Sequence, residues 1–420
     1  MSHSILLVEP DNIEENLYPF SVMHCGWEIR LGAFKKYEKI QREFGEACLL
    51  YFTKREKHLR SFLKRVECAP QQIGDEDLLV LKTNTTHSKH FWNNVQEALK
   101  HYSTPQPVLF KNGEEAVAAF IPKGILAQRD DSKQFSVLSD FKSEFYADFE
   151  TENITIKVLD HLWNALDYVE ESIEDDFRFF DNEFDFSQAK NGGYFLCNEK
   201  EIYIGEGTKI APGVVLDASD GPIIIGKNAK IMANAVVIGP CFIGDNSIIK
   251  IGAKIYEKTA IGESCKIGGE VENSIIHGFS NKQHDGFLGH SYLGEWVNLG
   301  ADTNTSDLKN TYGKISAVLR DKEIDSERMF LGLLAGDHTK SGINTMFTTG
   351  TVAGVSSNVI GAGYPPRSIP SFSFGGFKDS PVYEFQKAID VAKTVMLRRK
   401  KELLPEEEAL LKMEFERLAK

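Results

Sequence analysis

Residues 225–267 read IGKNAKIMANAVVIGPCFIGDNSIIKIGAKIYEKTAIGESCKI, and an aliphatic side chain recurs at every sixth position of this stretch. The recurring residues are Ile225, Ile231, Val237, Ile243, Ile249, Ile255, Ile261 and Ile267. Four places after each of them stands a small or short residue, namely Ala229, Ala235, Cys241, Ser247, Ala253, Thr259, Cys265 and Val271. A period of six fits neither an α-helix, with about 3.6 residues per turn, nor an ordinary strand, with a period of about two.

This six-residue period is the hexapeptide signature of a parallel β-helix, in which three short strands form one triangular coil of about 18 residues. The aliphatic side chain is expected to point into the prism and to stack on its equivalent in the next coil. A glycine directly after the aliphatic residue permits the turn at a corner, as at Gly226, Gly244, Gly262 and Gly268. The sequence therefore predicts a solenoid.

The same period extends in both directions from residues 225–267. It begins at Ile204 and Ile210, before an insertion at residues 217–222. Beyond the stretch we expect it to continue at Phe287, Leu293 and Leu299, and to resume at Ile343, Thr349 and Val355. Between residues 304 and 330 the period is lost, and residues 309–322 are interpreted as a polar excursion from the coil. Such excursions often complete a binding site on one face of a solenoid.

Composition limits the class of protein. The chain has 420 residues, enough for two or three domains, and a net charge of −13, which argues against nucleic acid or an anionic membrane as a partner. No apolar run is long enough for a transmembrane helix or a secretory signal. The six cysteines show neither paired nor metal-type spacing, so no metal site is expected and a reducing cytoplasm is the natural location.

Strand-like and helix-like segments alternate before the solenoid. Strands are expected at residues 5–9, 47–53, 78–82, 107–110 and 116–121, and helices at 34–44, 56–66 and 161–174. This order predicts an α/β domain with a mostly parallel sheet, and such sheets bind ligands at the carboxyl ends of their strands. The loop at residues 10–32 is therefore the first place to look for a binding site.

Three domains are expected from these patterns. They are an α/β domain at residues 1–192, the β-helix at 193–372, and a helical C-terminal tail at 373–420. In the tail, residues 382–403 are expected to form a helix, and Pro405 is well placed in the first turn of a second one. The basic run at residues 398–401 is interpreted as the solvated face of a helix.

Polar residues interrupt the solenoid most densely at residues 268–290, which contain His277, His284 and His290. Residues 302–310 add a second polar run. Histidine is the side chain best suited to accept a proton near neutral pH, and acyl transfer to an amine needs such a base. The two runs together predict a functional site.

These segments resemble a known family. Residues 268–310, with the flanking stretches 221–226 and 336–344, look like the solenoid of bifunctional sugar-1-phosphate nucleotidyltransferase/acetyltransferases. The variant group of UDP-N-acetylglucosamine diphosphorylase/glucosamine-1-phosphate N-acetyltransferase-like proteins, typical of Bacteroidetes, resembles this chain most, and residues 5–39 are similar to it as well. The resemblance implies a left-handed β-helix, acetyl-CoA as co-substrate, and N-acetyl transfer to an amino-sugar phosphate.

The resemblance also implies roles for individual residues of the β-helix. His284 aligns with the family's histidine base, and His290 takes that place if a one-residue gap falls elsewhere. Phe287 stands where the family has a tyrosine, and Asp307 where it has an asparagine that contacts the sugar. Further roles are an orienting amide at Asn298, a phosphate-binding cation at Lys282 or Lys309, and an N–H near Ala301 that stabilises the oxyanion.

The first domain departs more from the family. The variant group's Thr-Arg-Pro is replaced by Met23-His24-Cys25, while Glu28, Arg30 and Gly32 are kept. Arg30 and Lys35 are the cations left to bind a triphosphate. A nucleotidyl transfer at this site would use Mg²⁺, and the partners would be a nucleotide and a sugar phosphate.

Assembly and two other functions complete the expectations. Hexapeptide prisms typically pack in threes, so a homotrimer is expected, with the acetyl-CoA site between neighbouring prisms. One alternative is a trimeric scaffold that binds a nucleotide sugar with degenerate sites. The other is a zinc carbonic-anhydrase-like β-helix, although His277, His284 and His290 lie too close in sequence to stack on successive coils.

Overall fold

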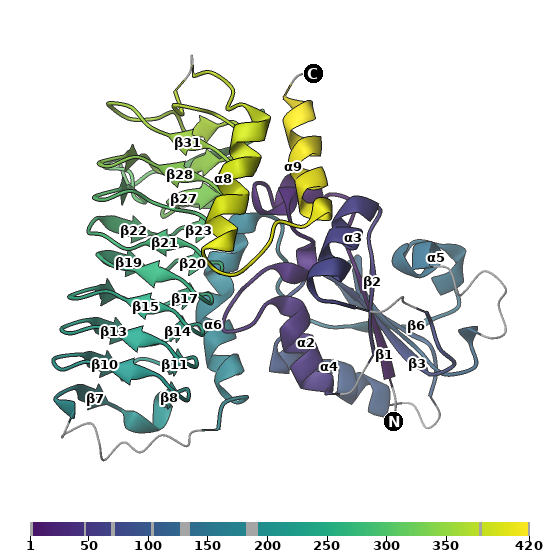
Figure 1. Ribbon diagram of the computed structural model, residues 1–420. Helices are drawn as coiled ribbons and strands as arrows, with labels where there is room; N and C mark the ends of the chain where they lie inside the picture. The colour runs from purple at the N-terminus through teal and green to yellow at the C-terminus, as the bar shows by residue number, and fades with distance from the viewer. Residues whose placement is uncertain are drawn as a thin grey trace. The chain divides into compact units, whose positions relative to one another are not determined.

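A computed structural model describes residues 3–45, 48–68, 72–101, 105–126, 135–181, 192–377 and 380–418. The chain forms two compact units (Figure 1). The first comprises residues 1–14, 24–29 and 35–160, and the second comprises residues 15–23, 30–34 and 161–420. The chain thus enters the second unit twice before it completes the first.

The first unit is built on a six-stranded sheet in the order β2-β1-β3-β5-β4-β6. Its strands are β1 (His3–Val8), β2 (Cys48–Phe52), β3 (Asp77–Lys82), β4 (Val108–Asn112), β5 (Glu115–Ile121) and β6 (Glu150–Asn153). Only β5 runs against the others, since β1, β2 and β3 pair in parallel, β4 pairs in parallel with β6, and both β3 and β4 pair with β5 antiparallel. The expected α/β domain with a mostly parallel sheet is confirmed.

Helices accompany this sheet along the chain. They are α1 (Ile13–Asn16), α2 (Lys36–Phe44), α3 (Glu56–Arg65), α4 (Lys89–Lys100) and α5 (Phe135–Ser139). Alternate residues of β1 join two different cores: Ile5 and Leu7 pack with Phe62 and Trp92, while Leu6 packs in the other cluster. Burial on both faces explains why β1 is a continuous apolar run rather than an alternating one.

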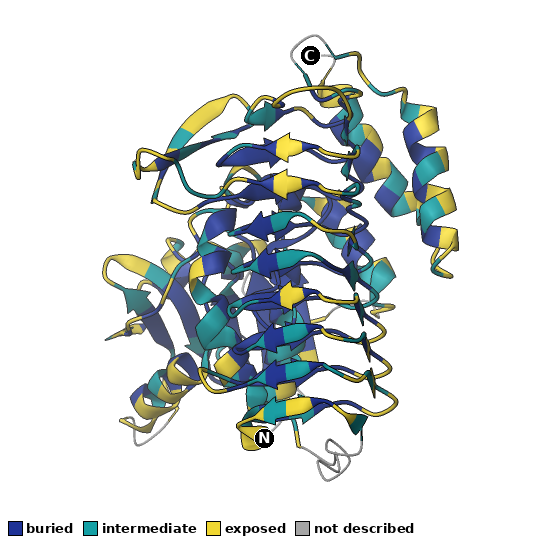
Figure 2. Cartoon of the chain, turned by 90° about the vertical axis from the view of Figure 1, so that its left-hand side faces the viewer, coloured by how far each residue is buried: buried dark blue, intermediate teal, exposed yellow. Residues whose placement is uncertain are grey.

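The second unit is a parallel β-helix whose coils stack one above the next (Figure 2). Its strands form three faces. The first face contains β7 (Phe195–Cys197), β10 (Val215–Asp217), β13 (Val236–Ile238), β16 (Lys254–Ile255), β19 (Glu270–Glu272), β22 (Phe287–Gly289), β24 (Asn304–Thr305) and β29 (Met346–Phe347). The second face contains β8 (Ile202–Ile204), β11 (Ile223–Ile225), β14 (Cys241–Ile243), β17 (Thr259–Ile261), β20 (Ile275–Ile276), β23 (Tyr292–Leu293), β27 (Leu333–Ala335), β30 (Thr351–Ala353) and β32 (Ser368–Ile369). The third face contains β9 (Lys209–Ile210), β12 (Lys230–Ile231), β15 (Ile248–Ile249), β18 (Lys266–Ile267), β21 (Asn281–Lys282), β28 (Lys340–Ser341) and β31 (Asn358–Val359).

The hexapeptide pattern between residues 225 and 267 is confirmed residue by residue. Each of its eight aliphatic side chains, from Ile225 to Ile267, is at most 1% exposed, and so is each small residue four places later. Strand pairing places each strand directly beside its equivalent one coil on, as in Ile231 beside Ile249 and Ile249 beside Ile267. The parallel β-helix follows from this register, while its left-handed sense stays a prediction.

Four of the expected interior positions beyond residue 267 are wrong, namely Phe287, Ile343, Thr349 and Val355. Leu288, not Phe287, pairs beside Val271 and is fully buried. After the excursion the interior positions are Ser341, Phe347, Ala353 and Val359, whereas Ile343 is 72% exposed in the turn after β28. The coil between β19 and β22 is shorter than the regular one, and the excursion resets the phase, so extrapolating a fixed period misplaces the inward side chains.

Additional elements cover the prism. Helix α6 (Ala165–Phe177) contacts β14, β17 and β20 of the second face, and the outward side chains of these strands, Phe242, Ala260 and Ile275, are buried. The excursion contains an antiparallel hairpin of β25 (Ile315–Leu319) and β26 (Lys322–Arg328). The expected polar excursion is therefore an ordered hairpin that reaches a few residues further.

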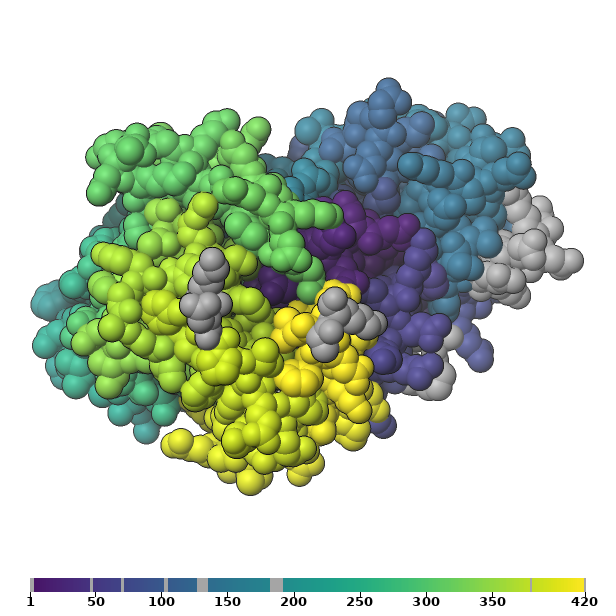
Figure 3. Space-filling view, turned by 90° about the horizontal axis from the view of Figure 1, so that it is seen from above, coloured from purple at the N-terminus to yellow at the C-terminus, as the bar shows by residue number. Residues whose placement is uncertain are grey.

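The C-terminal helices α8 (Phe385–Leu397) and α9 (Pro405–Arg417) belong to the same unit, and α9 begins at the expected proline. Phe372 of the last coil lies within 5.2 Å of Phe415 and 6.1 Å of Phe385, measured between ring centroids. Glu414 binds Arg320 of the hairpin and Ser371 of the last coil. Seen from above, the yellow α9 accordingly lies beside the yellow-green residues of the last coils (Figure 3).

Candidate functional site

The turns that connect the third face to the first form one corner of the prism, here called the His284 corner. His284 lies in the turn between β21 and β22, and Ala301 lies in the equivalent turn of the next coil. Both line an open cavity of about 500 Å³, together with Lys250, Ile251, Gly268, Gly269, Gln283, Asp285 and Asp302. The structure therefore brings the predicted base and the predicted oxyanion donor to one cavity.

Two groups at the His284 corner are available to a ligand. The His284 side chain is exposed, and its imidazole makes no hydrogen bond or ion pair with any residue that the structure describes. The N–H of Ala301 likewise donates no hydrogen bond within the described parts of the chain, although its carbonyl accepts one from Asn344 at 2.8 Å. Because an unpaired backbone N–H is costly unless water or a ligand reaches it, the position suits a transient acceptor such as an oxyanion.

Lys282 supports the turn that carries His284. It stands at an interior position beside Ile267 and is 2% exposed. Its Nζ donates to the carbonyl of His284 at 2.7 Å, and burial lowers the pKa of its ammonium to about 8. Lys282 is thus enclosed by the coil rather than presented to a phosphate, and it acts on the local conformation of the turn.

His290 lies at a different corner, the one between the first and second faces. Its Nδ1 is 2.7 Å from Oδ2 of Asp307, and its ring stacks on Phe330 with centroids 4.9 Å apart. A histidine oriented by a carboxylate has the geometry of a general base. The structure therefore separates the two rival histidines, and it gives each a distinct setting, one exposed in a cavity and one paired and stacked.

The remaining predicted residues of the β-helix are dispersed. Phe287 is half-buried on the first face, and its backbone N–H donates to the Asn304 side chain at 2.9 Å. Lys309 stays within the excursion, where its Nζ donates to the carbonyl of Lys314. Asn298 lines a second cavity on the third face, which shares only Gln283 with the cavity at the His284 corner.

The three clustered histidines do not converge within one chain. His277 is fully buried, and its Nε2 is 2.6 Å from the Tyr292 hydroxyl. His284 is exposed at one corner, and His290 is paired with Asp307 at another. The three side chains therefore do not meet, and the described residues of a single chain offer no three-histidine zinc site.

The predicted nucleotide-binding residues fall in both compact units. Glu28 and Lys35 belong to the first unit, and Arg30 and Gly32 to the second. The guanidinium of Arg30 is enclosed, since it contacts Glu263 at 3.2 Å and lies over the Phe242 ring at 5.4 Å. A Cβ on Gly32 would lie 2.6 Å from Oδ2 of Asp176 on α6. Arg30 and Gly32 therefore have packing roles in the β-helix unit.

Two buried carboxylates of the loop after β1 are already paired with arginines. Glu9, which follows β1, contacts Arg55 through two hydrogen bonds of 3.1 and 2.7 Å. Glu28 contacts Arg65 at 2.5 Å. Burial raises the pKa of Glu28, but Arg65 and His24 outweigh it and hold the pKa well below its usual range. Because Mg²⁺ needs oxygen ligands that are free to coordinate, Glu9 and Glu28 do not fit a magnesium site.

A polar cluster at the end of β3 was missed from the sequence. Burial lowers the pKa of Lys36 to about 7, and its Nζ donates to the carbonyl of Thr83. Thr83 Oγ1, Asn84 Oδ1 and His87 Nδ1 are buried without a hydrogen-bond partner in the parts of the chain that the structure describes. The signal was present, because the run Thr-Asn-Thr-Thr-His at residues 83–87 directly follows the expected strand 78–82.

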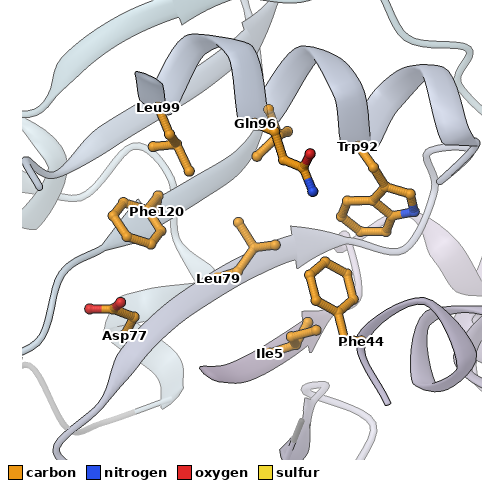
Figure 4. Close-up of a pocket in the computed structure, with 9 residues that line it drawn as sticks. Ile5, Phe44, Asp77, Leu79, Trp92, Gln96, Leu99 and Phe120 are labelled. Carbon is orange, nitrogen blue, oxygen red and sulfur yellow. The ribbon is translucent and has the colours of Figure 1, made fainter. Parts of the chain in front are cut away.

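The first unit also contains an apolar cavity of about 150 Å³, at the amino end of β3 (Figure 4). It is lined by Ile5, Phe44, Asp77, Leu79, Trp92, Val95, Gln96, Leu99 and Phe120. With one carboxylate and no cation on its walls, this cavity does not suit a phosphate group. The carboxyl edge therefore remains the better position for a nucleotide.

Comparisons with known proteins find similarity for parts of the chain. Residues 5–184 match the family described as sugar nucleotidyl transferase. The bifunctional protein GlmU of Rippkaea orientalis is 34% identical over 110 residues, which cover 25% of this chain and 22% of that protein. A bifunctional sugar-1-phosphate nucleotidylyltransferase/acetyltransferase of Sulfurisphaera tokodaii is 31% identical over 145 residues, 33% of this chain and 35% of that protein.

The matches to these curated relatives are partial. The bifunctional protein GlmU of Synechococcus sp. strain CC9311 is 28% identical over 163 residues, 38% of this chain and 30% of that protein. The chain thus spans between about a fifth and about a third of the length of the relatives it matches. Residues 5–184 are thus similar to the sugar nucleotidyl transferase family, and parts of the chain are similar to bifunctional sugar-1-phosphate nucleotidylyltransferase/acetyltransferases.

Proposed function

We propose that the β-helix transfers the acetyl group of acetyl-CoA to the amine of an amino-sugar phosphate. The observation that carries this proposal is the cavity of about 500 Å³ at the His284 corner. The His284 imidazole and the N–H of Ala301 line it, and neither has a hydrogen-bond partner among the described residues. The relatives described as nucleotidylyltransferase/acetyltransferases support the same reaction class.

The chemistry needs no covalent enzyme intermediate. The acceptor amine attacks the thioester carbonyl, so that a C–N bond forms and the C–S bond breaks. His284 takes the proton that the amine loses, and the leaving thiolate takes up a proton to become the free thiol of coenzyme A. The N–H of Ala301 donates to the carbonyl oxygen as negative charge develops on it, and Asn298 contacts an acceptor that reaches past Gln283.

The experiment is release of free thiol from acetyl-CoA in the presence of a panel of amino-sugar phosphates. A positioned base contributes about 10²- to 10⁴-fold, so His284→Ala should lower kcat by that order while the protein stays folded. His290→Ala is the matched control, with an imidazole removed at the other corner. If His290→Ala abolishes thiol release and His284→Ala does not, His290 with Asp307 is the base, and if neither matters, the acetyltransferase proposal fails.

We propose nucleotidyl transfer to a sugar 1-phosphate as a second activity, in the first unit. The nucleotide would bind at the carboxyl edge of the sheet. Its support is the family match over residues 5–184 together with the buried polar atoms of Thr83, Asn84 and His87 that have no partner among the described residues. Pyrophosphate release from UTP and N-acetylglucosamine 1-phosphate tests it. Binding of UDP-N-acetylglucosamine without turnover would instead support the scaffold with a degenerate site.

A homotrimer is proposed as the working assembly. Ile251, Ile343 and Ile360 are 65%, 72% and 44% exposed, and all three lie in turns of the His284 corner. Exposed isoleucines gathered at one corner are typical of a surface that a second copy covers. Light scattering of the full chain should give three times the monomer mass. Ile343→Glu should lower the measured mass, because it places a charge on the proposed contact surface.

A cytoplasmic location is proposed as well, because all six cysteines are free. Among the described residues, no helix is both long and apolar enough to cross a bilayer.

A further inference from the structure

The third face of the β-helix carries a cavity of about 530 Å³, here called the third-face cavity. Four cationic side chains line it: Lys266 and Lys340 from the coils, and Arg398 and Arg399 from the segment that follows α8. No carboxylate is among its lining residues, although the whole chain has a net charge of −13. Positive charge is thus concentrated here against the overall composition.

The register of the coils explains how these cations come together. Lys266, Asn281, Asn298 and Lys340 occupy the same outward position in successive strands of the third face. Neighbouring strands lie about 4.8 Å apart, so side chains at this position form a tight column. Lys266 and Lys340 are therefore separated by only two amide side chains, and both stand opposite the end of α8.

The cavity's own contacts leave the positive charge without a neutralising partner. Arg399 donates to the carbonyl of Ser264 and to Oδ1 of Asn281, each at 3.1 Å, and Lys340 donates to the carbonyl of His338 at 2.8 Å. All three acceptors are uncharged, and none of the four cations has an ion pair within the described residues. Burial, followed by repulsion from Arg399, lowers the pKa of Lys266.

We propose that the third-face cavity binds a phosphate group, either inorganic phosphate or a phosphomonoester on a larger molecule. A doubly charged anion with several acceptor oxygens is the ligand that clustered arginine and lysine side chains recognise best. The flanking amides of Asn281, Gln283 and Asn298 add donors for the oxygens that the cations leave over. The third-face cavity shares only Gln283 with the cavity at the His284 corner, and phosphate binding in it can be measured without acetyl transfer.

The test is calorimetric titration of the full-length protein with inorganic phosphate at constant ionic strength. Lys266→Gln removes one charge from the cavity without breaking any hydrogen bond found in the described structure. Lys230→Gln is the matched control, because Lys230 occupies the same outward position two coils earlier and does not line the cavity. We expect Lys266→Gln to weaken phosphate binding about tenfold and Lys230→Gln to leave it unchanged.

A thermal readout separates binding from folding. Without phosphate, the melting temperature of Lys266→Gln should equal or exceed that of the wild type, because the substitution relieves repulsion from Arg399. Added phosphate should raise the melting temperature of the wild type by more than that of Lys266→Gln. Competition by coenzyme A, dephospho-coenzyme A and glucosamine 1-phosphate then shows which molecule supplies the phosphate. The proposal is overturned if the wild type does not bind phosphate, or if Lys266→Gln and Lys230→Gln bind it equally.

Discussion

The ammonium of Lys282 donates a hydrogen bond to the backbone carbonyl of His284, 2.7 Å away, from a position inside the prism. An aliphatic side chain stands at the equivalent position of the coil below, Ile267. The exchange of an apolar residue for a lysine costs desolvation of the ammonium, and in return it fixes the turn that presents the proposed base.

Replacing Lys282 by methionine should therefore separate activity from stability. The apolar side chain suits the interior, so the melting temperature should be unchanged or higher. The turn loses its anchor, so acetyl transfer should fall about tenfold as His284 moves from its position. Ile267→Met, one coil below, is the control for repacking, and undiminished activity in Lys282→Met would contradict the assigned role.

Gly32→Ala should destabilise the β-helix unit. The added Cβ would lie 2.6 Å from Oδ2 of Asp176, and that oxygen is held in place by the N–H of Ala33 at 2.8 Å. Overpacking of this kind typically costs about 1–3 kcal/mol in unfolding free energy. Gly74→Ala is a fair control, since the nearest atom to its Cβ is a flexible Glu76 oxygen at 3.3 Å. Chemical denaturation measures the unfolding free energy of both variants. If Gly32→Ala is as stable as Gly74→Ala, α6 moves to make room for the added methyl group at residue 32.

The pairing of Arg320 with Glu414 should hold α9 on the hairpin of β25 and β26. Nη1 and Oε1 are 3.2 Å apart, and the Glu414 side chain is only 5% exposed. Arg320→Ala leaves that carboxylate buried without its main cation, which costs about 3–5 kcal/mol for a fully buried pair. Limited proteolysis should then cut the C-terminal helices first. Lys412→Ala, on an exposed pair of the same helix, should leave the cleavage pattern unchanged.

Stability should rise with pH because of Lys36. Its pKa in the folded protein is about 7, below the value of about 10.4 in an unfolded chain. Between these values the unfolded state binds more protons, so the unfolding free energy increases with pH, by up to about 1.4 kcal/mol per unit. The gain disappears as pH falls through about 7. Urea unfolding of the wild type and Lys36→Met at several pH values tests this, because the unfolding free energy of the wild type should rise relative to that of the variant from neutral to alkaline pH.

The sequence predicts the position of a residue well where neighbouring residues in the chain determine its environment, and poorly where distant segments do. The regular hexads could be assigned residue by residue, because a strict period leaves only one set of inward positions. Phe287 was misassigned because a short coil changes the phase, and Ile343, Thr349 and Val355 were misassigned because the hairpin changes it again. Neither change has a local signature. Helix α4 and strand β6 were not expected either, since β6 is a polar edge strand whose pairing with β4 is a tertiary contact.

The candidate site was predictable in composition but not in arrangement. The sequence placed His284 and His290 six residues apart in one polar run, and only the coil geometry shows that they stand at different corners. The basic run at residues 398–401 was expected to be solvated throughout. The structure turns Arg399 inward, against Ser264 and Asn281. Contacts between segments more than 100 residues apart leave no trace in a periodic pattern.

The aromatic contact of Phe372 with Phe385 and Phe415 has a consequence for solubility. Strand β32 is the last of its sheet and pairs only with β30 among the described strands. A prism cut off at that point would present an apolar cross-section and a row of open backbone groups, on which the first coil of another molecule could continue the stack. Phe385 of α8 and Phe415 of α9 cover the Phe372 ring, so the two C-terminal helices remove part of the apolar surface that the last coil would otherwise offer to another molecule.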